Sequence, residues 1–214
     1  MNGIKTLALA LAALLACGAL LAASASANVF TAEAESVEVV GSQTEEGQHV
    51  FSVEGSKAQC ESAYFATEGE IAVPTETAEL HPEFSGCIVF GFINVPIQTT
   101  GCNLVFHAGT VATEGETFDG SVDLICTPGN VVTITAGTCA IQLDTQEGLG
   151  GIRYENQTGG EVLVEANVSG IAVNKTKDGL PCPLGGTGET TGNYTGYTHV
   201  SGVSKESSVG IAVE

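Results

Sequence analysis

Basic residues are scarce and tryptophan is absent in this 214-residue chain. It has six lysines and arginines against 25 aspartates and glutamates, which gives a formal net charge of −19 at pH 7. Because phosphate backbones and anionic membrane surfaces repel such a chain, nucleic-acid binding is excluded. The chain has no tryptophan and only four tyrosines, which argues against a lectin or a glycosidase that holds sugars on aromatic platforms.

Motifs for catalysis and for cofactor binding are also missing. Residues 202–206 resemble a G-x-S-x-G nucleophile elbow but lack the closing glycine. The glycine-rich residues 185–188 have neither the lysine nor the following helix of a phosphate loop. We therefore predict no catalytic residue and no cofactor. A pair of carboxylates of the kind that a glycosidase uses stays an open alternative, because the 25 acids offer too many pairs to rank.

A metal site is not expected either. The histidines have no H-E-x-x-H or H-x-H spacing and stand alone at His49, His81, His107 and His199. Isolated histidines of this kind are typical of surface positions or of hydrogen-bonded core positions. Residues 119–123 lack the carboxylate density of a calcium loop.

The N-terminal 27 residues have the layout of a secretory signal peptide. Asn2 and Lys5 form a short, weakly positive start, and residues 7–23 form an apolar run made almost wholly of leucine and alanine. The run ends in the A-x-A site at residues 25–27, so cleavage after Ala27 is predicted. Export would place residues 28–214 in an oxidising compartment, where cysteines form disulfides.

Cys17 offers an alternative to release. Residues 14–17 resemble the cleavage box of bacterial lipoproteins, which would leave the protein lipid-anchored at Cys17 and associated with the cell envelope. The apolar run continues past Cys17 to a good A-x-A site, so a secreted protein is favoured. No transmembrane segment is expected in the mature chain.

Six cysteines remain after the signal peptide, and they favour three disulfides among 15 possible pairings. They are Cys60, Cys87, Cys102, Cys126, Cys139 and Cys182. Cys60 and Cys87 lie in successive strand regions, which predicts the bridge between them. Cys102 and Cys126 are equidistant from the acidic loop at Glu114, so a hairpin turning there would set them opposite each other. Cys139 and Cys182 remain as the third pair.

The mature sequence reads as many short strands. Apolar residues alternate with polar ones in segments such as residues 49–53, 103–107, 122–126 and 161–168, and glycine-rich turns separate the segments. The most apolar segment, residues 87–95, predicts a central strand that is buried on both faces. We therefore predict an all-β fold, an antiparallel β-sandwich or barrel, as one domain over residues 28–214.

The pattern resembles a group of uncharacterised secreted β-proteins of actinobacteria. The resemblance covers most of the mature chain and depends on short segments: HPEFSGC at 81–87, FGF at 90–92, TGCN at 100–103, Val105-Phe106, ANVSGI at 166–171, the Cys182 loop and VGIAVE at 209–214. It implies a bacterial, secreted, cysteine-bearing β-fold. It implies no catalytic residues, because the group has no assigned activity.

These observations favour a non-enzymatic exported module, acting in binding or structure at the cell surface or outside the cell. The alternative is a secreted hydrolase that uses carboxylates. An enzyme should show a cleft in which two acids, or an acid and a histidine, converge. A binding or structural module should show a closed core with its acids on solvent-facing surfaces. No particular partner is predicted.

Overall fold

The computed structural model describes residues 28–45, 47–113, 117–177 and 188–214, and all regular secondary structure within them is β-strand. The predicted signal peptide and Cys182 lie outside the described residues. No helix in the described part of the chain is long and apolar enough to cross a membrane.

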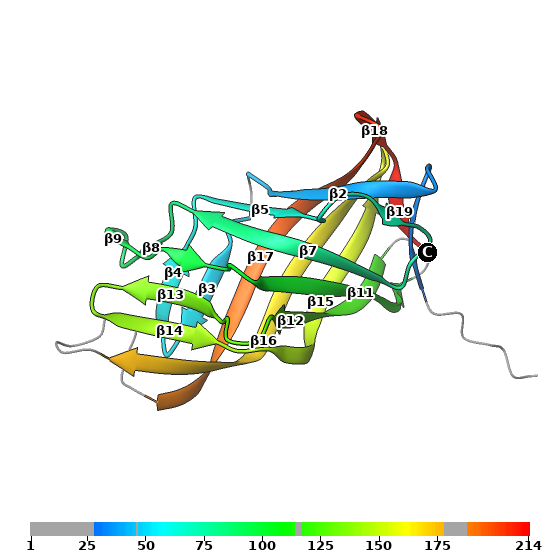
Figure 1. Cartoon of the computed structure of the whole chain (residues 1–214). Helices are drawn as coiled ribbons and strands as arrows, with labels where there is room; N and C mark the ends of the chain where they lie inside the picture. Colours follow the sequence, from blue (N-terminus) through cyan, green and yellow to red (C-terminus); the bar gives the residue numbers. More distant parts are fainter. Residues whose placement is uncertain (1–27, 46, 114–116, 178–187) are drawn as a thin grey trace, which may run out of the picture.

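Eight antiparallel strands close on themselves into a barrel (Figure 1). In order around the barrel they are β2 (Ser36–Gln43), β5 (Ser62–Ala66), β7 (Thr77–Ser85), β11 (Cys102–Thr113), β12 (Thr117–Cys126), β15 (Gln146–Gln157), β16 (Glu161–Lys177) and β17 (Gly188–Ser204). β17 then pairs with β2 through contacts such as Val200 with Gly41, which closes the ring. The prediction of an antiparallel sandwich or barrel is resolved in favour of the barrel.

Alternation along the strands decides which side chains face inward. In β16, Val162, Ala166 and Val168 are buried, while residues between them are more exposed. The same period of two appears in β7, where Ala78 and Leu80 are buried. Because successive side chains of a strand point to opposite faces, each strand gives the barrel an apolar inner wall.

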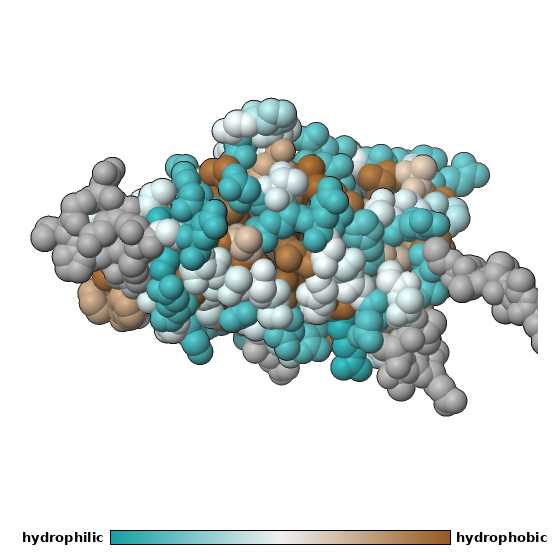
Figure 2. All heavy atoms as spheres, turned by 90° about the horizontal axis from the view of Figure 1, so that it is seen from below, coloured by the Kyte–Doolittle hydropathy of each residue, from teal (hydrophilic) through white to brown (hydrophobic). Residues whose placement is uncertain are grey.

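The outer wall has the opposite character. Figure 2 shows the molecule from below, where hydrophilic and neutral side chains cover most of the face and apolar ones lie between them. The hydrophilic side chains of the outer wall therefore have access to solvent. This is expected for an antiparallel sheet that packs one face against the core and exposes the other to water.

One end of the barrel carries a second arc of shorter strands, which we call the hairpin end. Its strands are β3 (Val50–Val53), β4 (Ser56–Gln59), β8 (Ile88–Val89), β9 (Ile93–Asn94), β10 (Ile97–Gln98), β13 (Val132–Ala136) and β14 (Cys139–Leu143). β3 pairs with β17, and β14 pairs with β16, so the two longest strands belong to both the barrel and the arc. Figure 1 shows these hairpins together at the left of the molecule.

The opposite end, which we call the ribbon end, holds both ends of the described chain. β1 (Phe30–Ala32) pairs with β19 (Ile211–Val213) in a two-stranded ribbon. Phe30 also exchanges backbone hydrogen bonds with Thr75, at 2.7 Å and 3.0 Å. The short strands β6 (Ile71–Ala72) and β18 (Ser207–Val209) pair with β2 and β17 at the same end.

Two disulfides brace the hairpin end. Cys60 follows β4 and bonds Cys87, with 3.8 Å between their Cα atoms. Cys102 opens β11 and bonds Cys126, the last residue of β12, with 4.0 Å between Cα atoms. These two residues are direct partners in the ladder, so the hairpin argument for their pairing is confirmed. Stable disulfides indicate an oxidising environment outside the cell. The third bridge stays a prediction, since Cys182 is not described.

The prediction for residues 87–95 is wrong. The segment forms a tight hairpin of two short strands, β8 and β9, rather than one central strand. Val89 and Val95 are fully buried, but Phe90 and Phe92 are 56% and 78% exposed. The reason is a turn: Phe90 and Gly91 both have positive φ, of 54° and 79°, which no extended strand allows.

Candidate ligand-binding site

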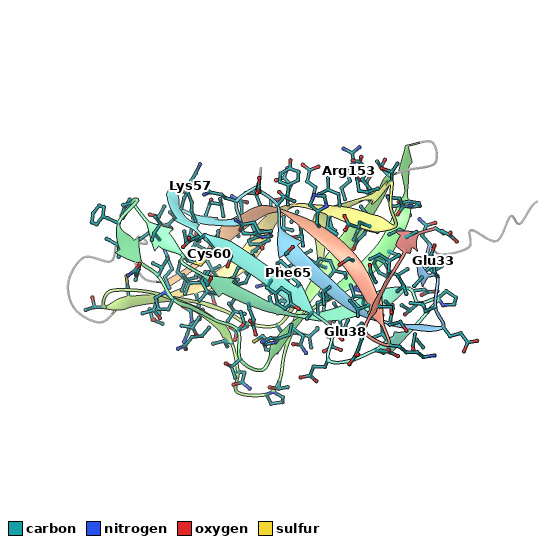
Figure 3. The ribbon with its side chains drawn as sticks, turned by 90° about the horizontal axis from the view of Figure 1, so that it is seen from above. Glu33, Glu38, Lys57, Cys60, Phe65 and Arg153 are labelled. Carbon is teal, nitrogen blue, oxygen red and sulfur yellow. A yellow bond between two sulfur atoms is a disulfide. The ribbon has the colours of Figure 1, made fainter. Side chains whose placement is uncertain are left out.

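An apolar cavity of about 170 Å³ lies inside the barrel. All eight barrel strands contribute side chains to its wall, so the cavity belongs to the barrel interior and not to a surface groove. One wall residue from each strand, in order around the ring, is Val39, Phe65, Leu80, Phe106, Val122, Tyr154, Ala166 and Thr198. Figure 3 shows the barrel from above with Phe65 near its middle.

Very few polar side chains line the wall, and each of them already has a hydrogen-bond partner inside the protein. The Thr99 hydroxyl donates to the Pro82 carbonyl at 2.7 Å, and the Tyr154 hydroxyl donates to the His107 carbonyl at 2.9 Å. The Thr31 hydroxyl donates to the Ala212 carbonyl. The hydroxyls of Tyr194 and Thr198 are both hydrogen-bonded to the ring of His49. Because each of these groups has a partner within the protein, the cavity presents mainly carbon to a ligand.

His49 is the one histidine among the described residues that line the cavity. It stands directly before β3, and its ring lies against Gly196 of β17, where a Cβ would collide with the ring. Its Nε2 is 3.2 Å from the Tyr197 carbonyl, which can only accept, so Nε2 carries the proton. Nδ1 then accepts the hydroxyl of Tyr194. Both nitrogens are used, and the tautomer is set by these partners.

Burial decides the charge state of this pair. Loss of solvation lowers the pKa of His49 from 6.5 to about 4, although the hydrogen bond to Tyr197 opposes this. Burial raises the pKa of the Tyr194 hydroxyl above its ordinary value. Both groups are therefore neutral at pH 7, and the cavity wall carries no charge from them.

Phe30 lines the cavity at the ribbon end. Its ring stands edge-on to Tyr154, with ring centroids 5.4 Å apart and an interplanar angle of 86°. Because Phe30 belongs to β1, its position depends on the pairing of β1 with β19 and with Thr75. The ribbon therefore forms part of the wall rather than a separate element.

No carboxylate or ammonium is found among the described residues that line the cavity. The acid that comes nearest to a hydrolase arrangement, Asp123, lies outside the cavity. Asp123 receives an N–H from Gly148 at 2.6 Å and the His107 Nε2 at 2.8 Å. Partial burial raises the pKa of Asp123, but these two hydrogen bonds outweigh it and leave the pKa below its usual value.

The His107–Asp123 pair lies on the outer face of β11 and β12. Ser121 is the ladder partner of His107 and so shares its face, but the structure describes no hydrogen bond between the two side chains. An activated nucleophile would need such a bond. The pair thus has the histidine and its carboxylate but not the connected serine of a catalytic triad.

The remaining histidines lie apart. His81 Nδ1 is 3.1 Å from the Asn103 side-chain oxygen, and His199 Nδ1 is 3.8 Å from Glu161. Across the described residues, no three histidine, cysteine or acidic side chains come close enough to hold a metal ion. In the described residues each of the four histidines thus has its own separate polar partner.

The cavity is the feature that the sequence reading missed. Apolar residues alternate along the barrel strands, and this pattern predicts an apolar interior. The pattern is the same whether that interior is filled by side chains or contains a cavity. His49 also gave a signal, as a histidine directly before the alternating β3 segment, and only the fold shows that it meets Tyr194.

Comparisons with protein-family models, curated protein sequences and solved structures find no match for this chain. The fold and the cavity alone therefore define its class: a closed eight-stranded antiparallel β-barrel with an apolar interior. Barrels of this strand number are wide enough to hold one small ligand.

Proposed function

We propose that the protein is an exported, non-enzymatic binding module that holds one small apolar ligand inside its barrel. The observation that carries the proposal is the cavity of about 170 Å³, whose polar groups are all bonded within the protein. An apolar cavity of about 150 Å³ is large enough to bind benzene, so the expected ligand has roughly six to eight non-hydrogen atoms.

The same observation argues against ligands with a charged or strongly polar head group. Such a group would lose its hydration in the cavity and find no unpaired partner there, at roughly 2–7 kcal/mol for an uncharged group. The expected ligand is therefore a hydrocarbon or a halogenated hydrocarbon without an acid, amine or hydroxyl group.

The test compares matched probes by nuclear magnetic resonance titration of the exported protein. Benzene and hexane should shift resonances of barrel residues, phenol should bind more weakly, and hexanoate should not bind. Equal binding of hexane and hexanoate would contradict an all-carbon site. Absence of binding by every probe would contradict the proposal as a whole.

A pair of variants on β16 shows whether binding occurs in the cavity. Ala166→Leu adds three carbon atoms to the cavity wall and should abolish benzene binding. Ala172→Leu is the control, because it adds the same atoms to an exposed position of the same strand. Filling a cavity commonly leaves stability unchanged or raises it, so loss of binding by Ala166→Leu should occur in a folded protein.

Export is the second part of the proposal, supported by the signal-peptide pattern and by the two disulfides. Residues 28–214 are proposed as one secreted domain. The intact mass of protein from the culture medium should correspond to a chain that begins at Asn28. A lipid-modified species that begins at Cys17 would place the barrel on the cell envelope instead.

A further inference from the structure

The turn between β8 and β9 exposes two phenylalanines to solvent. Phe90 is 56% exposed and Phe92 is 78% exposed, more than any other large apolar side chain in the described residues. Exposed apolar groups of this size gathered at one point indicate a surface that meets a membrane or a protein. The cavity does not explain them, because neither residue lines it.

The backbone of the turn is unfavourable for Phe90. The Phe92 N–H donates to the Val89 carbonyl at 3.3 Å, and the residues between them, Phe90 and Gly91, have positive φ. Glycine or asparagine adopts this conformation easily, whereas a bulky residue is strained by about 1–2 kcal/mol. The free protein thus carries both backbone strain and an exposed ring, and burial of the ring against another surface would offset both.

The base of the turn is held firmly. Val89 and Val95 are fully buried, Cys87 is bonded to Cys60, and Val89 pairs with Ala58 of β4. The two rings therefore project from a fixed position, and little conformational entropy would be lost on docking.

The sequence around the turn is free of charge. No aspartate, glutamate, lysine or arginine occurs in residues 84–113 or in residues 124–143, although the chain has 25 acids. The second segment forms β13 and β14, which lie at the same hairpin end (Figure 1). Figure 3 shows Lys57 toward this end and Glu33 and Glu38 toward the ribbon end.

From these observations we propose that the hairpin end docks on a lipid bilayer with neutral, zwitterionic head groups, and that Phe90 and Phe92 insert into it. A bilayer accepts a convex apolar tip, whereas a protein partner would need a matching groove. A second copy of this chain is disfavoured because each copy has a net charge of −19 and the two would repel each other. The same repulsion disfavours anionic lipids.

Vesicle binding by the exported protein tests the proposal. Vesicles of pure phosphatidylcholine should bind the protein, and replacement of a third of the lipid by phosphatidylglycerol should weaken binding at low salt. The variant Phe90→Asn/Phe92→Ser should bind at least about 100-fold more weakly, since each buried phenylalanine contributes at least about tenfold to partition.

Two controls separate insertion from folding. Phe90→Asn relieves the strained backbone, so its melting temperature should equal or exceed that of the parent while its vesicle binding falls. Tyr64→Ser removes another exposed aromatic ring, 43% exposed on β5, and should bind vesicles like the parent.

Three results would overturn the proposal. The first is no partition of the parent into phosphatidylcholine, and the second is equal vesicle binding by the double variant and the parent. The third is formation of dimers in solution by the parent but not by the double variant, which would make the turn a contact between copies. None of these results bears on hydrocarbon binding in the cavity, so the two proposals fail separately.

Discussion

His49 is a buried group whose charge state links stability to pH. Its pKa in the folded protein is about 4, against 6.5 for an exposed histidine. Between these values the unfolded chain binds a proton that the folded chain does not, so acid favours unfolding. The stability that depends on a neutral His49 is therefore fully present above pH 6.5. As the pH falls toward 4, the free energy of unfolding drops by about 3 kcal/mol on account of this group.

Urea unfolding at pH 7 and pH 4.5 should reveal this loss. His49→Gln is the matched variant, because glutamine keeps a donor and an acceptor but does not titrate. The parent should lose more stability than His49→Gln between the two pH values, since Tyr194, the other titratable group on the ring, stays protonated throughout. Equal losses would mean that the carboxylates, and not His49, govern acid unfolding.

Gly109 occupies a position that no other residue fits. It has a φ of 71° in the bulge of β11, and a Cβ there would overlap the Asp119 carbonyl. Gly109→Ala should lower the unfolding free energy by about 1–2 kcal/mol of backbone strain and about 1–3 kcal/mol of overpacking. Gly137→Ala is the control, with a φ of 62° and open space around it, and should show the strain alone.

At the scale of elements, the β11–β12 hairpin is held by a disulfide across its open end. Cys102 and Cys126 are 24 residues apart, and a loop of this length contributes about 3–4 kcal/mol in the entropic model. In urea unfolding, the double variant Cys102→Ala/Cys126→Ala should therefore show a free energy of unfolding that is lower by that amount. A loss below about 1 kcal/mol would show that the reduced, unfolded chain keeps this hairpin.

The β14–β16 pairing supports the remaining bridge. Cys139 is the ladder partner of Lys177, which lies five positions before Cys182 in the sequence. This proximity favours the predicted Cys139–Cys182 bond over any exchange with the other two bridges. Digestion without reduction should release a peptide pair that joins these two cysteines. A free thiol at Cys182 would contradict the prediction.

The strands themselves were largely predictable because they depend on local alternation. Residues 161–168 and 122–126 carry that pattern in their own side chains. Closure of the barrel could not be predicted in this way, because the pairing of Val200 with Gly41 joins segments far apart in the sequence. The error at residues 87–95 has a local cause: Gly91 separates two phenylalanines that look like core residues, and only the backbone turn shows that they face water.

For the whole molecule, the two clusters of buried side chains share neighbours. Phe30, Leu104, Phe106 and Val200 pack against both clusters. Unfolding should therefore be a single transition, with coincident curves from circular dichroism and from the fluorescence of the buried tyrosines. Two separated transitions would mean that the two clusters unfold independently of each other.

The pairing of β1 with β19 has a consequence for the timing of folding. Phe30 precedes its ladder partner Val213 by most of the described chain, so it leaves the ribosome long before Val213 does. Until β19 has been made, only the pairing with Thr75 holds Phe30 at the cavity wall, and the ribbon end of a partly synthesised chain is incomplete. Such long sequence separation also slows folding, because the loop must close before the contact forms. Because β17 closes the barrel and β19 completes the ribbon, the chain can still pass unfolded through a narrow channel until these two strands have been made.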